Sequence, residues 1–535
     1  MTTVADSLAA GLREAGVEIV YGLPGGENVE VVDALRRAGI RLVLVHHESS
    51  AVFMADAGAR LTGTPGVCLT TLGPGAANAV AGVAHAYLDR APVLILTAQV
   101  PEHLQAYHTH QLVDLRALLA PITKGSIQVR PENAWDSIPA ALLLATSGRP
   151  GPVHIQVSND VAAQPAPARP AERPSARPGA PAPADCTAAL ALLVSSRRPA
   201  IVVGLGLEPE RPYDALRRLA EAAGAPVITT PKAKGALPDD HPLAAGTIGL
   251  TRADPAYAIL GQADCILAIG FDVVELVKPW DQRAPLIWLA PWANADPELA
   301  THAVCVGRQR PVLEELAGAA YAPAADWGAA RVAQYRAALA GQALPTPAPG
   351  RLLPQAVLAA LRRAAPRDAI FTVDVGSHKI LASLTWPTYT PNSFLVSNGL
   401  SSMGFGLPAA IAASIVSPGR GVICATGDAG LAMALGELGI LMRSRQPVIV
   451  VVFHDAALNL IRAQQLRAGK PVYGTEFANP DFMRIAEAYQ IDGYRVTSEE
   501  QCAAAVAAAL AAQRPALIEA MIDPISYPTT PPPKV

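Results

Sequence analysis

Short apolar runs alternate along this chain with longer stretches in which apolar residues recur at helical spacing. Runs of strand length that are apolar throughout are typical of parallel strands buried on both faces. Because helix-like stretches separate them, we expect a parallel α/β sheet over residues 1–163. The strands expected in this part lie at 18–21, 42–45, 66–70, 92–96 and 152–157.

The same alternation returns twice, after stretches rich in proline and alanine. Residues 164–185 cannot pack and are expected to form an extended linker. We predict a second α/β unit over 186–340 and a third over 352–535, whose end from Pro524 should be extended or disordered. The predicted fold class is therefore α/β, with three doubly wound parallel sheets. The strands expected in the last two units lie at 199–203, 226–229, 264–269, 285–289, 303–306, 369–373, 393–396, 421–426, 447–453 and 516–521.

Composition narrows the choice of function. A chain of 535 residues with 51% hydrophobic residues suits about three globular domains, and a net charge of -3 without a basic block gives no reason to expect nucleic acid or a membrane surface. Mean hydropathy is +0.26, but the apolar runs are too short to span a bilayer, and the amino terminus is patterned as a helix rather than a signal peptide. Six scattered cysteines are expected to be small buried hydrophobes, so we expect a cytoplasmic protein.

Two acids follow neighbouring strands of the third unit. The run 421–426 leads into Gly427-Asp428, and the run 447–453 leads into His454-Asp455. Residues 431–443 fit a crossover helix, so both acids should lie at the carboxyl edge of the sheet, where Mg²⁺ and a phosphate would be bound. The ordinary alternatives are that Asp428 only caps a helix and that Asp455 is only a turn residue.

Gly427-Asp428 followed by Asp455, 27 residues after the first acid (455 − 428), resembles the metal-binding pattern of thiamine diphosphate enzymes. Several further strings occur in the order found in the acetolactate synthase branch of that family. The resemblance implies the three-domain thiamine-diphosphate-binding fold, the cofactors thiamine diphosphate and Mg²⁺, and a homodimer or homotetramer in which domains of different subunits enclose the cofactor. The strings are PGG at 24–26, HHES at 46–49, GPGAAN at 73–78, THQ at 109–111, VDVGSH at 373–378, SNGLSSMGFGLPAA at 397–410 and GDAG at 427–430.

The same resemblance assigns ligands. Asp428, Asp455 and the main-chain carbonyl of Ala457 match the metal ligands, although Ala429 stands where glycine is usual and His454-Asp455 stands where two asparagines are commonest. Met403 matches a residue beneath the cofactor, but core packing explains it equally well. The expected cofactor contacts are Pro24, Glu48, Asn78, Gly376, Ser377, His378, Ser401, Met403, Gly427, Asp428, Ala429, Gly430, Asp455 and Leu460.

Glu48 matches the glutamate that hydrogen-bonds the aminopyrimidine ring of the cofactor. A carboxylate against that ring nitrogen would promote removal of the thiazolium C2 proton, which makes Glu48 the first candidate catalytic residue. Its ordinary alternative is a rim carboxylate that caps a helix over residues 49–60.

The substrate side is where the family divides. Gln111 matches a glutamine that faces the reacting centre, and His110 beside it is the third catalytic candidate. Gln464 and His110 resemble the catabolic, pyruvate-specific synthases, and Leu460 and Ile461 would be apolar walls of the pocket. Glu27 stands where those enzymes carry lysine. A carboxylate near the pocket disfavours a second anionic acceptor unless it is protonated or turned away.

Three functions remain open. The first is an acetolactate synthase-like enzyme that decarboxylates a 2-oxo acid and joins the product to a second carbonyl compound. The second is a simple 2-oxo acid decarboxylase that releases an aldehyde, and the third is a non-catalytic homologue. We expect FAD to be absent, because Gly204-Leu205-Gly206 lacks the third glycine of a dinucleotide turn and Gly270-Phe271-Asp272 replaces an arginine-containing string.

Overall fold

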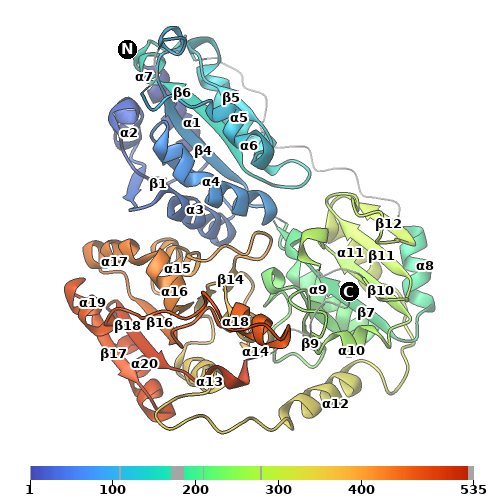
Figure 1. The fold of residues 1–535 in the computed structure, drawn as a ribbon. Helices are drawn as coiled ribbons and strands as arrows, with labels where there is room; N and C mark the ends of the chain where they lie inside the picture. Colours follow the sequence, from blue (N-terminus) through green and yellow to red (C-terminus); the bar gives the residue numbers. More distant parts are fainter. Residues whose placement is uncertain (1, 108–109, 170–185, 209, 277–279, 528–535) are drawn as a thin grey trace. The chain divides into compact units, whose positions relative to one another are not determined.

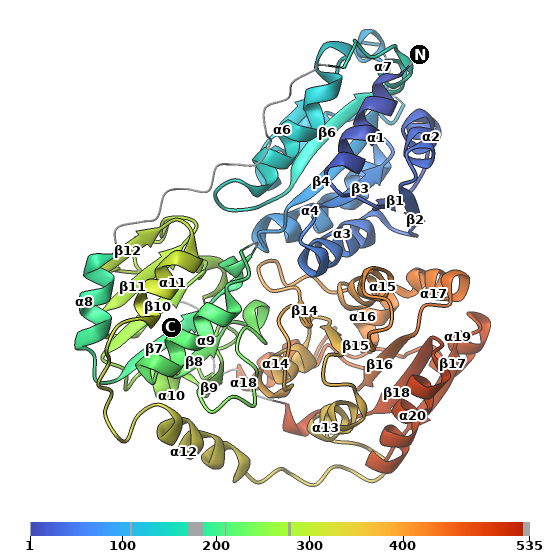
Figure 2. The same cartoon turned by 180° about the vertical axis from the view of Figure 1, so that it is seen from behind.

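The structure, a computed structural model, describes residues 2–107, 110–169, 186–208, 210–276 and 280–527. Three six-stranded parallel sheets, each flanked by helices, follow one another along the chain (Figures 1 and 2). The predicted α/β fold with three parallel sheets is thus confirmed. The domain boundaries given above stay a prediction.

The first sheet has the strand order β2-β1-β3-β4-β6-β5. Strands β3, β4 and β6 are buried along their whole length, as expected of strands covered on both faces. The strands are β1 (Ile19–Gly22), β2 (Arg41–Leu44), β3 (Gly66–Thr70), β4 (Val93–Gln99), β5 (Ser126–Gln128) and β6 (Val153–Ser158). The helices are α1 (Val4–Glu14), α2 (Val29–Arg37), α3 (Glu48–Thr62), α4 (Pro74–Leu88), α5 (Leu115–Leu119), α6 (Ala134–Thr146) and α7 (Asn159–Ala163).

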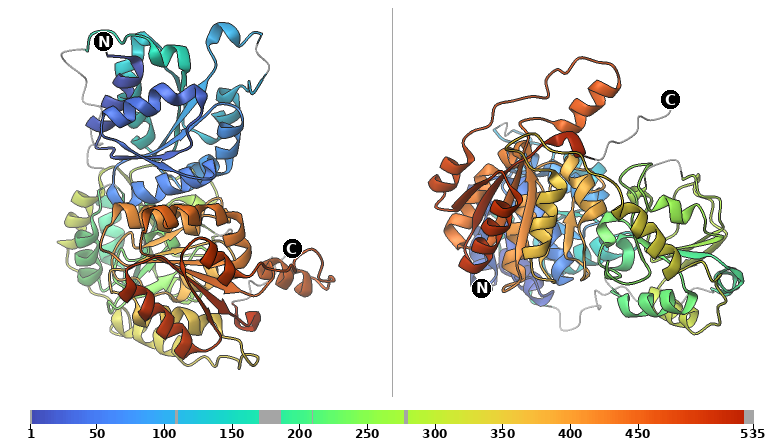
Figure 3. Two further views of the ribbon diagram at one scale, coloured as in Figure 1. Left: turned by 90° about the vertical axis from the view of Figure 1, so that its left-hand side faces the viewer. Right: turned by 90° about the horizontal axis from the view of Figure 1, so that it is seen from below.

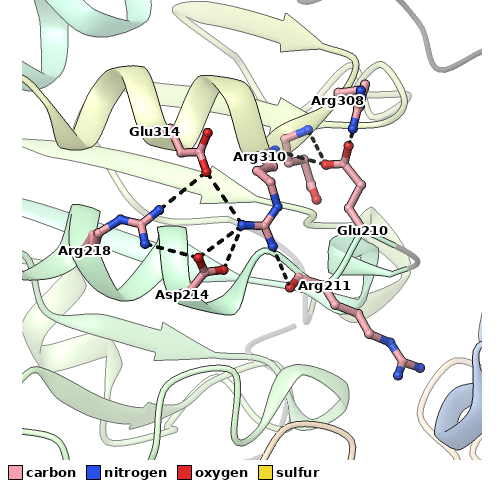
Figure 4. A network of polar contacts seen from close by, with 8 residues as sticks. Glu210, Arg211, Asp214, Arg218, Arg308, Arg310 and Glu314 are labelled. Atoms are coloured by element: carbon pink, nitrogen blue, oxygen red, sulfur yellow. Dashed lines mark hydrogen bonds and ion pairs between the residues drawn. The ribbon is translucent and has the colours of Figure 1, made fainter.

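The central sheet has the order β12-β11-β10-β7-β8-β9. Its strands are β7 (Pro199–Val203), β8 (Val227–Thr229), β9 (Ala244–Thr247), β10 (Cys265–Ile269), β11 (Leu286–Ala290) and β12 (Ala303–Val306). Its helices are α8 (Thr187–Ser195), α9 (Tyr213–Ala223), α10 (Tyr257–Leu260) and α11 (Gln309–Ala317), and α12 (Ala329–Ala340) follows. Exposed arginines and acids join α9 to α11 in the network drawn in Figure 4, in which Asp214 accepts from both Arg218 and Arg310.

The third sheet has the order β14-β13-β15-β16-β18-β17. Helices α13 and α20 pack side by side, and their buried residues share one apolar core with the sheet (Figure 3). The strands are β13 (Ile370–Val373), β14 (Phe394–Val396), β15 (Val422–Gly427), β16 (Val448–His454), β17 (Asp492–Val496) and β18 (Ala516–Met521). The helices are α13 (Pro354–Ala364), α14 (Ser377–Thr385), α15 (Gly406–Val416), α16 (Asp428–Met433), α17 (Leu438–Ser444), α18 (Asn459–Arg467), α19 (Phe482–Ala488) and α20 (Glu499–Ala512).

Each sheet contains one strand that the apolar pattern missed. These strands are β5, β9 and β17, and each is an outermost strand of its sheet. An edge strand is covered less completely than a central one, so it needs no continuous apolar run. In β17, for example, exposed and partly buried residues alternate up to Val496.

The described residues separate into two compact units. The first comprises residues 1–179 together with Gly399–Gly419 and Ala432–Gln446, and the second comprises the rest of the chain. Helices α15 and α17 therefore belong to the unit of the first sheet, in which α15 packs on α3.

Three expectations need correction. The helix expected over 431–443 is interrupted, because a 3-10 turn (Leu435–Glu437) separates α16 from α17. Cys186 and Cys305 are paired as a disulfide, so they are not the free cysteines that we expected. The chain from Pro524 is folded as far as Tyr527, which is buried, and the remainder of the expected extended tail lies outside the described residues. No helix in the described ranges combines the length and apolarity needed to cross a membrane.

Candidate functional site

Glu48 begins helix α3, directly beyond strand β2, and its side chain is buried. One carboxylate oxygen accepts a hydrogen bond from the Asn78 side-chain amide at 3.1 Å. Glu48 does not cap α3, because the cap is His47, whose ring nitrogen accepts from the Ser49 N–H at 3.2 Å. The ordinary explanation of Glu48 as a helix cap is therefore wrong.

The loop that opens α4 lies against Glu48. A Cβ added at Gly75 would lie 3.1 Å from a Glu48 carboxylate oxygen, so the loop approaches this carboxylate closely. Gly73 has a φ of +49°, and a Cβ there would meet the Gln111 carbonyl oxygen at 2.5 Å. Glu48, Asn78 and Gln111 thus come together around one glycine-rich loop.

The loop after β1 carries Pro24, which is exposed, and Glu27. A Glu27 carboxylate oxygen accepts from the Thr71 hydroxyl at 2.8 Å. The buried Asn28 holds the loop closed, because it accepts from the Gly25 N–H at 2.9 Å and donates to the Leu23 carbonyl at 3.3 Å. Glu27 therefore lies at the same edge of the first sheet as Glu48, with a hydroxyl as its partner.

Three more predicted residues belong to this first unit. Ser401 and Met403 lie in the segment that leads into α15; Ser401 is exposed with a φ of +55°, and Met403 is partly buried. His110 is exposed. Their assignment to the cofactor and the substrate stays a prediction.

In the second unit, Asp428 follows β15 as the first residue of α16 and is buried. One of its oxygens accepts from the Ala456 N–H and from the Asn479 side-chain amide, both at 2.7 Å, and the other accepts from the Ala429 N–H at 2.8 Å. Asp428 therefore links the ends of β15 and β16 instead of only capping a helix.

Asp455 lies at the end of β16, close enough to Asp428 for the two charges to interact. Burial and the charge of Asp428 raise the pKa of Asp455 to about 7. An Asp455 oxygen accepts weakly from the Ala457 N–H at 3.3 Å. The isolated bridge between Ala457 and Glu476 is made by the groups of the neighbouring residues, so it does not use the Ala457 carbonyl. Two acids whose charges repel one another suit a divalent cation.

The Gly376-Ser377-His378 turn lies beside this pair of acids. A Cβ at Gly427 would lie 3.2 Å from the His378 ring, and one at Gly430 would lie 2.7 Å from an Asp374 oxygen, so both glycines permit close packing. The Nε2 atom of His378 is buried and makes no hydrogen bond to the described residues. Burial lowers the pKa of His378 to about 4, and an anion beside Nε2 would favour a proton there.

The residues around Asp428, Asp455 and His378 fit a metal-bound diphosphate. Gly427 lets the chain pack against the His378 ring, whose Nε2 makes no hydrogen bond to the described residues, and two acids supply oxygen ligands. The donor set fits the group. Leu460, Ile461 and Gln464 all lie on α18, a helix with no buried residue, and Ile461 and Gln464 are exposed.

Sequence reasoning missed several partners of these acids. Asn479 bridges Asp428 and the His454 ring, which it reaches at 3.1 Å. The other ring nitrogen of His454 lies 2.6 Å from Glu519, which also accepts from Arg495. No short-range pattern marks these residues, because each is separated from its partner by at least 24 positions.

The glycine turn of the central sheet is filled by protein groups. The buried Glu275 accepts from the Leu205 N–H at 3.0 Å and from the Thr230 hydroxyl. A Cβ at Gly206 would lie 2.6 Å from the Trp292 ring. Because a carboxylate occupies the main-chain N–H that a diphosphate would need, this turn does not fit a dinucleotide.

Comparison with known proteins covers all three sheets. The family models described as thiamine pyrophosphate enzyme N-terminal TPP binding domain, central domain and C-terminal TPP binding domain match residues 2–118, 186–302 and 374–520, respectively. The acetolactate synthase large subunit of Parasynechococcus marenigrum (strain WH8102) is 34% identical over 99% of this chain and 89% of its own length. The isozyme 3 large subunit of Escherichia coli (strain K12) is 33% identical over 95% of this chain and 92% of its own length.

A third relative is named for a different activity. The "Probable 2-ketoarginine decarboxylase AruI" of Pseudomonas aeruginosa (strain PAO1) is 33% identical over 91% of this chain and 88% of its own length. The resemblance found in the sequence is confirmed by these matches. The chain belongs to the thiamine pyrophosphate enzymes, in the acetolactate synthase family.

Proposed function

We propose that this thiamine-diphosphate-dependent enzyme decarboxylates a pyruvate-like 2-oxo acid and joins the remaining fragment to a second carbonyl compound. The observation that carries the proposal is the environment of Glu48. Its carboxylate is buried at the rim of the first sheet, where it accepts a hydrogen bond from the neutral amide of Asn78. A carboxylate that is not paired with a cation in this way can bind a protonated ring nitrogen.

Each group of residues has a separate task in this proposal. The bound thiazolium supplies a carbanion and an electron sink. Glu48 hydrogen-bonds the pyrimidine ring and favours the tautomer that takes the C2 proton, while Asn78 orients the carboxylate. Pro24 and the 73–78 loop line the pyrimidine side, and Ser401 and Met403 complete it.

The metal is Mg²⁺, held by Asp428, Asp455 and the Ala457 carbonyl, with Asn479 and the Ala456 N–H fixing the Asp428 carboxylate. The diphosphate lies against the turn of Gly427, Ala429 and Gly430 and against the turn of Gly376 and Ser377. His378 provides the ring nitrogen, and Leu460 adds an apolar contact.

On the substrate side, Gln111 and His110 contact the 2-oxo acid, and Gln464 and Ile461 bound the acceptor pocket. Glu27 decides between the two candidate reactions. In the structure, the Glu27 carboxylate accepts a hydrogen bond from the Thr71 hydroxyl. While this bond is made, the carboxylate does not point freely into the acceptor pocket.

The second candidate is a 2-oxo acid decarboxylase that protonates the same fragment and releases an aldehyde. The relative from Pseudomonas aeruginosa favours it, because that protein is named a probable 2-ketoarginine decarboxylase. Glu27 also supports it, since a carboxylate near the pocket suits a cationic side chain better than a second anionic acceptor.

The two candidates give different products. The purified protein is incubated with thiamine diphosphate, Mg²⁺ and either pyruvate or 2-oxo-5-guanidinopentanoate. Acetolactate from pyruvate supports the first candidate; acetaldehyde from pyruvate, or the guanidino aldehyde, supports the second. Calorimetry that detects no thiamine diphosphate binding would instead indicate a non-catalytic homologue.

Glu48→Gln provides the control for either product. We expect it to fold, to bind the cofactor and to turn over roughly 10²–10⁴-fold more slowly than the parent, because one general-base element is lost. Turnover at the parent rate would refute the role of Glu48.

We further propose a homodimer or homotetramer without bound FAD, with domains over 1–163, 186–340 and 352–535. The misfit of a diphosphate at the glycine turn of the central sheet supports the FAD part. Mass measurement in solution and the absorbance spectrum of the purified protein test these points.

A further inference from the structure

The loop that carries Glu48 is held by a carboxylate far away in the sequence. Glu437, at the end of the 3-10 turn before α17, is buried and belongs to the same compact unit as Glu48. One of its oxygens accepts from the N–H groups of His46 and His47, at 3.2 Å and 3.1 Å. The other accepts from the His46 N–H at 3.1 Å and lies 3.4 Å from the His46 ring.

Two glycines allow this approach. A Cβ at Gly436 would lie 3.2 Å from the His46 Cβ, and a Cβ at Gly439 would lie 2.9 Å from its ring. Arg443 makes two further contacts with this loop: it donates to the Leu44 carbonyl at 2.9 Å and lies 3.2 Å from the His46 ring. The segment from 436 to 443 therefore contacts the chain from the end of β2 to His47.

The position of these contacts gives them a consequence for Glu48. His46 and His47 immediately precede Glu48, and the His47 side chain is itself used to cap α3. With both N–H groups bonded to a charged acceptor, the main chain entering α3 has little freedom to rotate. The Glu437 carboxylate therefore fixes the main chain immediately before Glu48.

We propose that Glu437 is a positioning residue for Glu48, holding its carboxylate at the depth and angle that the pyrimidine ring requires. The proposal rests on the proposed role of Glu48. Glu437 touches neither substrate nor cofactor in this proposal; it acts through the two N–H groups.

The test compares Glu437→Gln with Glu275→Gln. Both replace a buried glutamate that accepts main-chain N–H groups, but Glu275 lies in the central sheet. In cofactor-free protein, we expect hydrogen exchange at the amides of residues 46 and 47 to speed up roughly tenfold in Glu437→Gln and not in Glu275→Gln. With thiamine diphosphate bound, exchange of its C2 proton should slow by about 10- to 100-fold in Glu437→Gln alone.

A double variant separates positioning from general destabilisation. In a Glu48→Gln background, Glu437→Gln should cause no further loss of C2 exchange, because its effect passes through Glu48. A further multiplicative loss, or unchanged C2 exchange in the single variant, would overturn the proposal. If Glu48→Gln alone exchanges as fast as the parent, the proposed function of Glu48 fails as well.

Should Glu437→Gln not fold, the same measurements are made on Arg443→Gln. This change removes only the neighbouring contacts to Leu44 and His46, and we expect a smaller loss of C2 exchange in the same direction, about threefold. An unchanged rate in that variant would then count against the proposal.

Discussion

The third sheet and the central sheet both carry a glycine-rich turn at the carboxyl end of a parallel strand, but different side chains surround the two turns. At the end of β15, a Cβ at Gly427 would meet the His378 ring and one at Gly430 would meet Asp374, and the turn lies beside two acids and a His378 nitrogen that makes no hydrogen bond to the described residues. At the end of β7, the turn at Gly204 is closed by Glu275 and Trp292. Close-packed glycines are common to both turns, so the difference between them lies in the acid pair and the His378 ring nitrogen.

The central sheet also differs from the other two in strand order. Numbered within each sheet, the first and third share the order 2-1-3-4-6-5, while the central sheet runs 3-2-1-4-5-6 from β9 to β12. The second order is that of dinucleotide-binding sheets. The sheet with the dinucleotide topology is thus the one whose turn is filled, so topology alone would have misplaced the cofactor.

The largest effect should come from removing charge at the open edge. Asp428→Asn keeps the size of the side chain but leaves Asp455 as the sole acid of the pair, and we expect Mg²⁺-dependent thiamine diphosphate binding to weaken by roughly 10²–10³-fold. Isothermal titration with and without Mg²⁺ measures this. Equal affinity in the parent and the variant would place the metal elsewhere.

A smaller loss is expected from Asn479→Ala, which removes the amide that joins Asp428 to the His454 ring. Outer partners of metal ligands typically contribute 10- to 100-fold in affinity, and we expect a change of about that size in the Mg²⁺ requirement. Asn294→Ala in the central domain serves as the matched control, because that amide donates to the carbonyls of Asp296 and Leu299 and accepts from the Asp296 N–H, all in its own loop. Mg²⁺ titrations of activity compare the two variants with the parent. If Asn479→Ala requires no more Mg²⁺ than Asn294→Ala, then Asn479 does not support the metal site.

Much of this fold could be predicted from apolar runs alone. Strands β15 and β16 were predicted to within a residue or two because they are buried on both faces, and the acids after them were found by reading on to the next residue. The edge strand β17 was missed since its exposed face carries polar residues such as Arg495.

The partners of the site residues were beyond such reasoning. Glu437 reaches His46 across 391 positions, and Glu275 reaches Leu205 across 70, so neither contact leaves a local trace in the sequence. His47 took the capping role that we had weighed for Glu48, because both residues stand where a helix begins and only the folded geometry separates them. Residue types can be matched to a family, whereas hydrogen-bond partners require the fold.

At the closed turn of the central sheet, the stability contributed by Glu275 should depend on pH and not on the cofactor. Burial raises the pKa of Glu275 from 4.5 to about 7. Between pH 4.5 and about 7, the folded protein keeps this proton while the unfolded chain loses it. The free energy of unfolding that is present below pH 4.5 therefore falls as the pH rises through 7. Glu275→Gln lacks this slope. Relative to the parent, we expect the variant to gain up to about 3 kcal/mol between pH 5 and pH 8, with thiamine diphosphate binding unchanged.

Melting temperatures of both proteins at the two pH values provide the measurement. The difference between variant and parent is the relevant quantity, because other titrating groups cancel in it. A difference that does not change with pH would mean that Glu275 is ionised in the folded protein, and the turn would then be closed by a charged carboxylate.

The smallest effect should come from the exposed network of the central domain (Figure 4). Arg310 lies 2.9 Å from Asp214 and 3.7 Å from Glu314, and about a third of its side chain is exposed to solvent. Water already screens these charges, so Arg310→Gln should lower the free energy of unfolding by less than about 1 kcal/mol, and 1 M salt should remove most of that change. Denaturant unfolding at low and high salt measures it. A loss of well over about 1 kcal/mol that persists in 1 M salt would show that water does not screen these ion pairs.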